Sequence, residues 1–396
     1  MNILFLSDEF LPKDGPCTKR IQTLAEYLRD QGHSIRIITS SQNKKGKQKA
    51  QLEGIRIRYV PAWPMKRKSA INRLLNNATF AVSAFFGALF FGKTDVIFTT
   101  SPPVMSSIAG VLASKLKRAK LVFDVRDIWP DVAVEMDSFG ENSLYYKVFS
   151  KIANRAYQQA ALITTVSPGK VEKIKEKVSA LQQNPDKVVY IGNGLDENFL
   201  KNQIDPEIVR QYDLENQYTC LYIGNIGLAQ GLGKLIDLAE NTRDLPVQFL
   251  LFGDGAEREK LEAQVVDKQL SNVRFCGTIE NRLVYTLLSK ANLSFISLKS
   301  NKMTDSIPTK IYEALGCGCP VFLIASGDSV DILKESGLGV ASDGLDLQKM
   351  TEDFRSLYHH VYTKEQKEYA SRLMCEKYSR QTFAAALQQC LLQIED

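Results

Sequence analysis

The sequence lacks the residue patterns of a disulfide framework, a zinc finger or a nucleic-acid binder. Its seven cysteines are an odd number without a C-x-x-C pair, and Cys317 and Cys319 stand too close together for a metal finger. The three histidines, His33, His359 and His360, are scattered outside the motifs described below and indicate no metal site. A net charge of +5 over 396 residues is a small bias. We therefore expect a protein of the reducing cytoplasm, with no nucleic-acid partner and no bound metal.

Long hydrophobic runs are also missing. The longest uncharged apolar run, Ala78 to Gly92, has about 15 residues, whereas a membrane-spanning helix needs roughly 20. The first residues, Asn2 to Leu6, read as a strand and lack the basic-then-apolar order of a signal peptide. The run from 78 to 92 is therefore predicted to be a core helix or a helix that lies on a surface.

What the chain does contain is a regular alternation of short apolar runs and helical-period segments, which is typical of an α/β fold with parallel sheets. A composition of 44 % hydrophobic and 24 % charged residues over 396 positions fits two domains. Strands are predicted at about 2–6, 34–39, 55–60, 94–98, 120–124, 162–166, 187–191, 218–223, 246–252, 272–276, 292–296, 319–324 and 338–341. Helices are predicted at about 18–31, 70–91, 103–117, 141–160, 168–179, 231–241, 255–268, 281–290, 308–317, 327–335, 346–375 in broken form and 380–394.

The joint between the domains is predicted near Asn193-Gly194, where a strand ends in a turn pair and a polar stretch from Asn198 to Pro206 follows. This places one domain at about 1–200 and the other at about 201–380. Because parallel sheets bind ligands at the carboxyl ends of their strands, two facing domains would share one cleft. Functional residues are therefore expected in the loops that follow strands.

The loop after the first strand, Ser7 to Pro16, has no G-x-G-x-x-G turn. That absence argues against a dinucleotide-dependent dehydrogenase. Gly15 in this loop either lets the backbone approach a phosphate or sugar, or is a flexible loop glycine.

Four ionisable residues crowd the end of a predicted buried strand at Asp124-Val-Arg126-Asp127-Ile-Trp-Pro-Asp131. One interpretation is an ion pair of Arg126 with Asp127 or Asp131 that orders the loop. The other is chemical: a carboxylate can orient an acceptor hydroxyl, and a guanidinium can bind sugar oxygens or phosphate.

Two glycine turns follow strands in the second half of the chain. The first contains Gly224, Asn225 and Gly227, and the second is Gly253-Asp254-Gly255. Backbone amides in such a turn, together with a helix N-terminus, favour anions such as a diphosphate. The second turn is equally consistent with a tight strand-to-helix connection.

The segment from Asp305 to Gly318 gives the sharpest signal. Pro308 suits a first helical turn and leaves the amides of Thr309 and Lys310 free beside a cationic side chain, which predicts a diphosphate site. Glu313, one turn further on, can accept hydrogen bonds from ribose hydroxyls. The alternative is an ordinary capped helix with a solvated Glu313.

Taken together these elements resemble the family-four retaining glycosyltransferases of the GT-B architecture, over nearly the whole chain. The resemblance rests on the Gly15 loop, Arg126-Asp127-Ile128-Trp129-Pro130, Asn193-Gly194-Leu195-Asp196, Gly224-Asn225-Ile226-Gly227 with Gln230-Gly231-Leu232, Gly253-Asp254-Gly255, and Pro308-Thr309-Lys310-Ile311-Tyr312-Glu313. It implies two facing Rossmann-like domains with an interdomain cleft, and a last helix, 381–396, that packs back on the first domain. The motifs are similar to those of the branch that builds bacterial O-antigen, capsule and exopolysaccharide, including N-acetylfucosamine transferases.

The sequence departs from the family pattern at three places. The family's Glu-x7-Glu motif reads Asp305-x7-Glu313, and the family's His-Asp pair reads Arg126-Asp127. The Arg and Lys that many members carry after the first glycine turn are replaced by Leu228-Ala229-Gln230, so Lys310 is expected to supply that charge.

The resemblance implies a retaining transfer, without metal or other cofactor, of an N-acetylated amino sugar from a UDP-sugar to a lipid-linked or saccharide acceptor. Arg126, Asp127 and Asp305 would be the catalytic residues. The residues expected to bind the donor are Gly15, Gly224, Asn225, Gly227, Gly253, Asp254, Gly255, Pro308, Thr309, Lys310 and Glu313. Two alternatives stay open, a nucleotide-sugar 2-epimerase of the same architecture and a catalytically silent sugar-nucleotide-binding subunit.

The segment from Met65 to Gly92 suggests contact with a membrane. Basic residues precede an aromatic-rich apolar helix, and a second basic loop lies nearby: Lys66, Arg67, Lys68 and Arg73, then Lys44, Lys45, Lys47 and Lys49. Such a helix can lie in the headgroup plane, as a polyprenyl-diphosphate acceptor on the cytoplasmic face of the inner membrane would require. Alternatively the helix packs on the first sheet and its charges are solvated.

Overall fold

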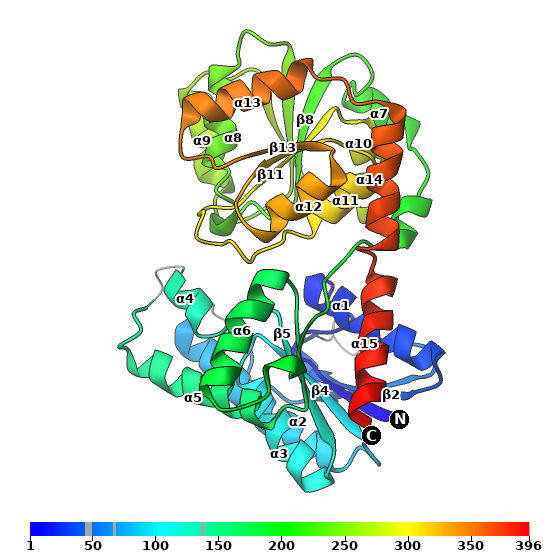
Figure 1. The fold of residues 1–396 in the computed structure, drawn as a ribbon. Coiled ribbons are helices and arrows are strands. Elements are labelled where there is room, and N and C mark those ends of the chain that lie inside the picture. Colours follow the sequence, from blue (N-terminus) through cyan, green and yellow to red (C-terminus); the bar gives the residue numbers. More distant parts are fainter. Residues whose placement is uncertain (44–49, 66–68, 136–138, 396) are drawn as a thin grey trace. The chain divides into compact units, whose positions relative to one another are not determined.

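The computed structural model describes residues 1–43, 50–65, 69–135 and 139–395. The chain divides into two compact units, which we call the N-terminal unit (Met1–Asn193 with Arg380–Asp396) and the C-terminal unit (Gly194–Ser379). Each unit has its own parallel sheet covered by helices on both faces, as Figure 1 shows. The predicted α/β class with two Rossmann-like sheets is thereby confirmed.

The N-terminal unit contains a seven-stranded parallel sheet in the order β3-β2-β1-β4-β5-β6-β7. Its strands are β1 (Asn2–Leu6), β2 (Ser34–Ser40), β3 (Ile55–Val60), β4 (Val96–Ser101), β5 (Lys120–Val125), β6 (Leu162–Thr165) and β7 (Val188–Tyr190). Its helices are α1 (Pro16–Asp30), α2 (Ala70–Leu89), α3 (Ser106–Lys117), α4 (Asp131–Glu135), α5 (Leu144–Gln159), α6 (Pro168–Ala180) and α15 (Arg380–Glu395). Helices α2, α3, α5 and α6 neighbour one another, and α1 packs against α15 (Figure 1).

The C-terminal unit contains a six-stranded parallel sheet in the order β10-β9-β8-β11-β12-β13. Its strands are β8 (Tyr218–Ile223), β9 (Val247–Phe252), β10 (Val273–Gly277), β11 (Leu293–Ser297), β12 (Val321–Ile324) and β13 (Gly339–Ser342). Its helices are α7 (Pro206–Gln211), α8 (Gly233–Asn241), α9 (Arg258–Asp267), α10 (Asn281–Lys290), α11 (Lys310–Gly316), α12 (Asp328–Ser336), α13 (Leu347–His359) and α14 (Lys364–Glu376). Helices α8, α9 and α13 neighbour one another, while α11 contacts α12 and α14 (Figure 1).

The strands are buried because parallel sheets are covered on both faces. All six residues of β4 and all four of β12 are buried. Two short helices, α4 and α7, were not predicted. The second had a local signal, since Asp205 accepts hydrogen bonds from the amides of Glu207 and Ile208 and Pro206 occupies the first turn.

Candidate functional site

The two glycine turns of the C-terminal unit pack directly on each other. Gly224 follows β8 with φ +140°, and Gly253 follows β9 with φ +139°, a region that side chains disfavour. A Cβ on Gly253 would lie 1.8 Å from the carbonyl oxygen of Gly224. Gly253 is therefore required by the close approach of two backbones and Gly224 by its positive φ, and the contact brings the predicted donor motifs together.

The residues that follow these glycines extend the same contact. The amide of Ile226 donates to the carbonyl of Asp254 at 2.9 Å, and a Cβ on Gly255 would lie 2.3 Å from the Ile226 carbonyl oxygen. Asn225 Nδ2 donates to Gln230 Oε1 at 3.5 Å, and a Cβ on Gly227 would lie 2.5 Å from the first of these atoms and 3.2 Å from the second. The first turn therefore leads through a 3-10 turn (Leu228–Gln230) into α8 with its backbone held by the second turn.

Lys310 connects the glycine turns to the segment predicted from Pro308 onward. Its Nζ lies 4.0 Å from the centre of the Tyr222 ring, and a Cβ on Gly224 would lie 2.8 Å from it. The Tyr222 hydroxyl donates to the Asn225 carbonyl at 2.6 Å. Burial lowers the pKa of Lys310 to about 7, although the charge of Glu313 opposes this effect. An anion beside Gly224 would restore the full charge of this lysine.

Helix α11 begins two residues later than predicted. Thr309 is its N-cap and Lys310 its first residue, while the Pro308 carbonyl accepts from the Ile311 amide at 3.0 Å. Pro308 therefore precedes the helix instead of occupying its first turn. Glu313 lies in the first turn and is partly exposed, and Asp305 is buried in the preceding loop.

In the N-terminal unit, neither of the predicted ion pairs of Arg126 is found among the described residues. Arg126 donates from Nε to Thr100 Oγ1 at 3.1 Å and from Nη2 to the Pro102 carbonyl at 2.7 Å. Asp131 instead accepts from Lys177 at 2.6 Å. Asp127 lies in the same loop, partly exposed, at the carboxyl end of β5.

Gly15 is the N-cap residue of α1 and has an extended backbone. No atom lies within 4 Å of the position that a Cβ would take there. Packing therefore does not require a glycine at this position, unlike Gly224 and Gly253.

A buried pair that the sequence interpretation missed lies beneath the Arg126 loop. Arg20 Nη2 contacts Asp124 Oδ1 at 2.7 Å, and both side chains are buried. The hydroxyls of Thr100 and Thr164 donate to the same carboxylate at 2.8 and 2.7 Å. Burial alone would raise the pKa of Asp124, but the Arg20 charge and these hydrogen bonds outweigh it and lower the pKa. Since Thr100 also accepts from Arg126, this network positions the loop.

Asp8 is a second residue that the sequence interpretation passed over. It follows β1 and lines a cavity of about 600 Å³ at the carboxyl edge of the N-terminal sheet. Its Oδ1 is buried without a hydrogen-bond partner in the described part of the chain. Burial and the charge of Glu9 raise the pKa of Asp8 to about 6, although the charge of Lys13 acts to lower it. Its place directly after a strand was the available signal.

Within the described residues, no group of three His, Cys, Asp or Glu side chains is arranged to hold a metal ion. In the same part of the chain, no helix is both long and apolar enough to cross a bilayer.

Both halves of the chain match known protein families. Residues 204–382 match the family described as "Glycosyl transferases group 1", and residues 16–194 match the "Glycosyl transferase 4-like domain". Both predicted halves of the chain are thus accounted for. The chain therefore carries a group 1 glycosyltransferase domain and a glycosyl transferase 4-like domain, and it is a glycosyltransferase.

Individual proteins similar to this glycosyltransferase agree with that assignment. It is 25 % identical over 341 residues, 80 % of its own length, to an Escherichia coli K12 protein named as a colanic acid biosynthesis glycosyl transferase, WcaI, and covers 82 % of that protein. The structure of Anabaena HepE in complex with UDP is similar, with a TM-score of 0.75, 17 % identity and coverage of 99 % and 100 % of the two chains. Sucrose-phosphate synthase from Thermosynechococcus elongatus has a TM-score of 0.79 at 16 % identity, covering 99 % and 98 %. These neighbours confirm the GT-B fold.

Proposed function

We propose that this glycosyltransferase moves an N-acetylated amino sugar from a UDP-sugar, with retention of configuration, to a lipid-linked or saccharide acceptor of a bacterial surface polysaccharide such as capsule or O-antigen. The observation that carries the proposal is the ammonium group of Lys310, held over Tyr222 beside Gly224 with its pKa lowered. The UDP bound to HepE and the polysaccharide role in the name of WcaI support the choice of donor and pathway class.

The chemistry at this site would centre on the departing diphosphate. As the bond from the sugar to the diphosphate breaks, negative charge accumulates on the phosphate oxygens, and a fixed cation with backbone amides stabilises it. Lys310 would supply the cation, the turns at Gly224 and Gly253 the amides, and Glu313 would bind the ribose hydroxyls. Asp305 would take the first acidic position of the family motif.

The first test measures UDP binding by calorimetry. Lys310→Ala and Glu313→Gln should each weaken binding by at least about tenfold, roughly 1.4 kcal/mol, because each removes a direct contact to the donor. The matched control is Lys260→Ala, since Lys260 is an exposed residue of α9 paired with Glu257. Wild-type affinity in both site variants would refute the donor assignment.

The second test addresses the acceptor. We place Asp127 and Arg126 on the acceptor side because they end a strand of the N-terminal unit. Asp127→Asn should reduce turnover by about 100-fold or more, as expected when a proton acceptor is lost, and leave UDP affinity unchanged. An equal loss of UDP affinity would move Asp127 to the donor. Donor consumption measured with and without a polyprenyl-diphosphate acceptor separates transfer from 2-epimerisation.

Contact with the cytoplasmic face of a membrane is part of the proposal. Apolar side chains are exposed along the outer sides of α2, α3 and α5: Ile71, Leu74, Leu75, Val82, Phe86, Leu112, Leu116, Leu144, Tyr145 and Val148. Asp95 is the single acidic residue between Met65 and Phe123, and α5 contains none. An apolar layer on three helices that carry basic but no acidic side chains complements an anionic bilayer. The basic residues within 44–49 and 66–68 lie outside the described residues.

A further inference from the structure

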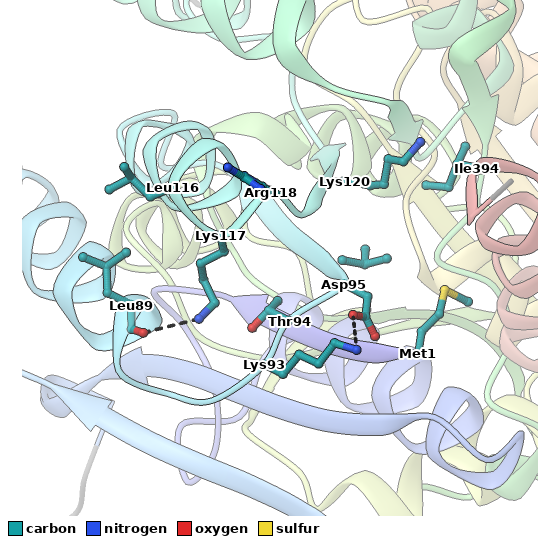
Figure 2. A pocket seen from close by; sticks show the side chains of 11 residues that line it. Met1, Leu89, Lys93, Thr94, Asp95, Leu116, Lys117, Arg118, Lys120 and Ile394 are labelled. Atoms are coloured by element: carbon teal, nitrogen blue, oxygen red, sulfur yellow. Dashed lines mark hydrogen bonds and ion pairs between the residues drawn. The ribbon is translucent and has the colours of Figure 1, made fainter.

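A cavity of about 700 Å³ lies at the amino edge of the N-terminal sheet, at the opposite end of the strands from Asp8 and Asp127. The starts of β1, β4 and β5, the ends of α2 and α3 and the last turn of α15 line it, as Figure 2 shows. Four of the lining side chains are basic, Lys93, Lys117, Arg118 and Lys120, and one is acidic, Asp95. None of them has a role in the proposed transfer.

Part of this positive charge has a structural explanation. Lys117 donates to the carbonyls of Gly92 at 2.8 Å and Leu89 at 3.3 Å, and the Leu89 contact is drawn in Figure 2. The buried Arg36 guanidinium donates to the carbonyls of Phe91 and Lys93. Both cations therefore satisfy carbonyl groups where α2 ends. Burial and the charge of Arg36 lower the pKa of Lys117, which shows that like charges accumulate here.

The other three basic residues have no such explanation. No hydrogen bond or ion pair of the Arg118 or Lys120 side chain is found in the described part of the chain, and Lys93 Nζ lies 3.9 Å from Asp95 (Figure 2). Asp95 already accepts from the amide and the side chain of Asn2 at 2.7 and 2.9 Å. Burial would raise the pKa of Asp95, but these bonds and nearby charges lower it, so it stays ionised. Because Asp95 is a single carboxylate and is already bonded to Asn2, it does not balance the four basic side chains, and the cavity carries a net positive charge.

The rim of the cavity continues the apolar layer of α2 and α3. Leu116 lines the cavity with 66 % of its surface exposed, and Phe90, which follows the lining residue Leu89 at the end of α2, is 76 % exposed. A soluble anion would gain nothing from these side chains. A lipid offers both a phosphate for the cations and acyl chains for the apolar rim.

We propose that this cavity binds the phosphate of an anionic lipid headgroup and so fixes how the N-terminal unit rests on the bilayer. The inference rests on the membrane contact proposed above and adds a defined lipid site to it. Lys93, Arg118 and Lys120 hold the phosphate, while Leu116 and Phe90 contact the acyl chains.

The test compares two variants that each remove three positive charges from the N-terminal unit. The cavity variant is Lys93→Gln, Arg118→Gln, Lys120→Gln. The control variant, Lys147→Gln, Lys151→Gln, Arg155→Gln, neutralises exposed residues of α5 that do not line the cavity. Binding is measured by sedimentation with phosphatidylcholine vesicles that contain phosphatidylglycerol, and chemical denaturation verifies that the N-terminal unit of each variant is folded.

Wild-type protein should bind these vesicles, and the cavity variant should bind at least about tenfold more weakly than the control variant, because only the cavity variant loses the cations that hold the lipid phosphate, while both lose the same general attraction to the anionic leaflet. Equal losses in both variants would overturn the cavity and leave the membrane contact standing. If the wild type binds UDP but no vesicles, the membrane contact fails, and the lipid site with it. A thermal shift with glycerol phosphate in that case would assign the cavity to a soluble anion instead.

Discussion

The N-terminal unit buries the basic side chain of Arg20 and the C-terminal unit partly buries that of Lys310, and the two charges are balanced in different ways. In the N-terminal unit, Arg20 contacts Asp124 at 2.7 Å and donates to the Gly192 carbonyl at 2.9 Å. In the C-terminal unit, the ammonium group of Lys310 lies over the Tyr222 ring, and the charge of Glu313 only partly offsets its burial. The pKa of Asp124 is lowered by its partner, whereas the pKa of Lys310 falls to about 7.

The difference separates a structural charge from one suited to a ligand. Arg20 finds its counter-ion within its own unit, so its burial holds strands and loop in place. Lys310 would gain its counter-ion from a bound diphosphate, and the free energy of that contact would then appear as affinity. Removing each charge should therefore affect different quantities.

The largest expected effect is on stability, at Asp124. Asp124→Asn leaves the Arg20 guanidinium buried without a counter-ion, which should cost about 3–5 kcal/mol in the free energy of unfolding of the N-terminal unit. Chemical denaturation measures the loss. Asp30→Asn is the control, because the Arg29–Asp30 pair lies at the surface of the same unit and its loss should leave stability nearly unchanged. A small effect at Asp124 would mean that Arg20 finds other partners.

The intermediate effect is on the pH dependence of UDP binding, at Lys310. Above pH 7 the free enzyme has lost this proton, and binding must take it up, so affinity should fall by up to about tenfold per pH unit between pH 7.5 and 9. Calorimetry in buffers of different ionisation enthalpy detects the proton. Lys310→Met should bind UDP weakly without this uptake. A flat wild-type profile would show that Lys310 keeps its proton throughout.

The lowered pKa of Lys310 should also make the free energy of unfolding depend on pH. Between pH 7 and about 10.4, the unfolded chain binds a proton at Lys310 that the folded chain does not, so the wild-type free energy of unfolding rises with pH relative to Lys310→Met. Denaturation curves of the two proteins at several pH values measure this difference.

The smallest effect on the free energy of unfolding is expected at Asp8, whose Oδ1 atom is buried without a hydrogen-bond partner in the described part of the chain. Its pKa is raised to about 6, so the folded chain binds the extra proton and wild-type stability should fall as the pH rises from about 4 to 6. Asp8→Asn should remove that slope and stabilise the N-terminal unit by about 1–3 kcal/mol at neutral pH, because each unit of the pKa shift corresponds to about 1.4 kcal/mol. Greater stability of the wild type at pH 7 would show that the ionised form has a partner.

Local sequence patterns were sufficient to predict most of the fold. Each predicted strand has an observed counterpart, since a strand covered on both faces reads as a short apolar run. The misses were short: α4 spans Asp131–Glu135 and α7 spans Pro206–Gln211, too few residues to show a helical period. The start of α11 was misplaced because Pro308 fits the position before an N-cap as well as the first turn.

The sequence by itself determined the alternation of strands and helices and the turns that carry Gly224, Gly253 and Lys310, because these depend on neighbours along the chain. Only the tertiary structure decided which of the charges meet. Arg20 and Asp124 are 104 positions apart, and Lys310, at the start of α11, contacts Tyr222 of β8. No local pattern encodes such pairs, since they arise from strand order and from the burial that sets each pKa.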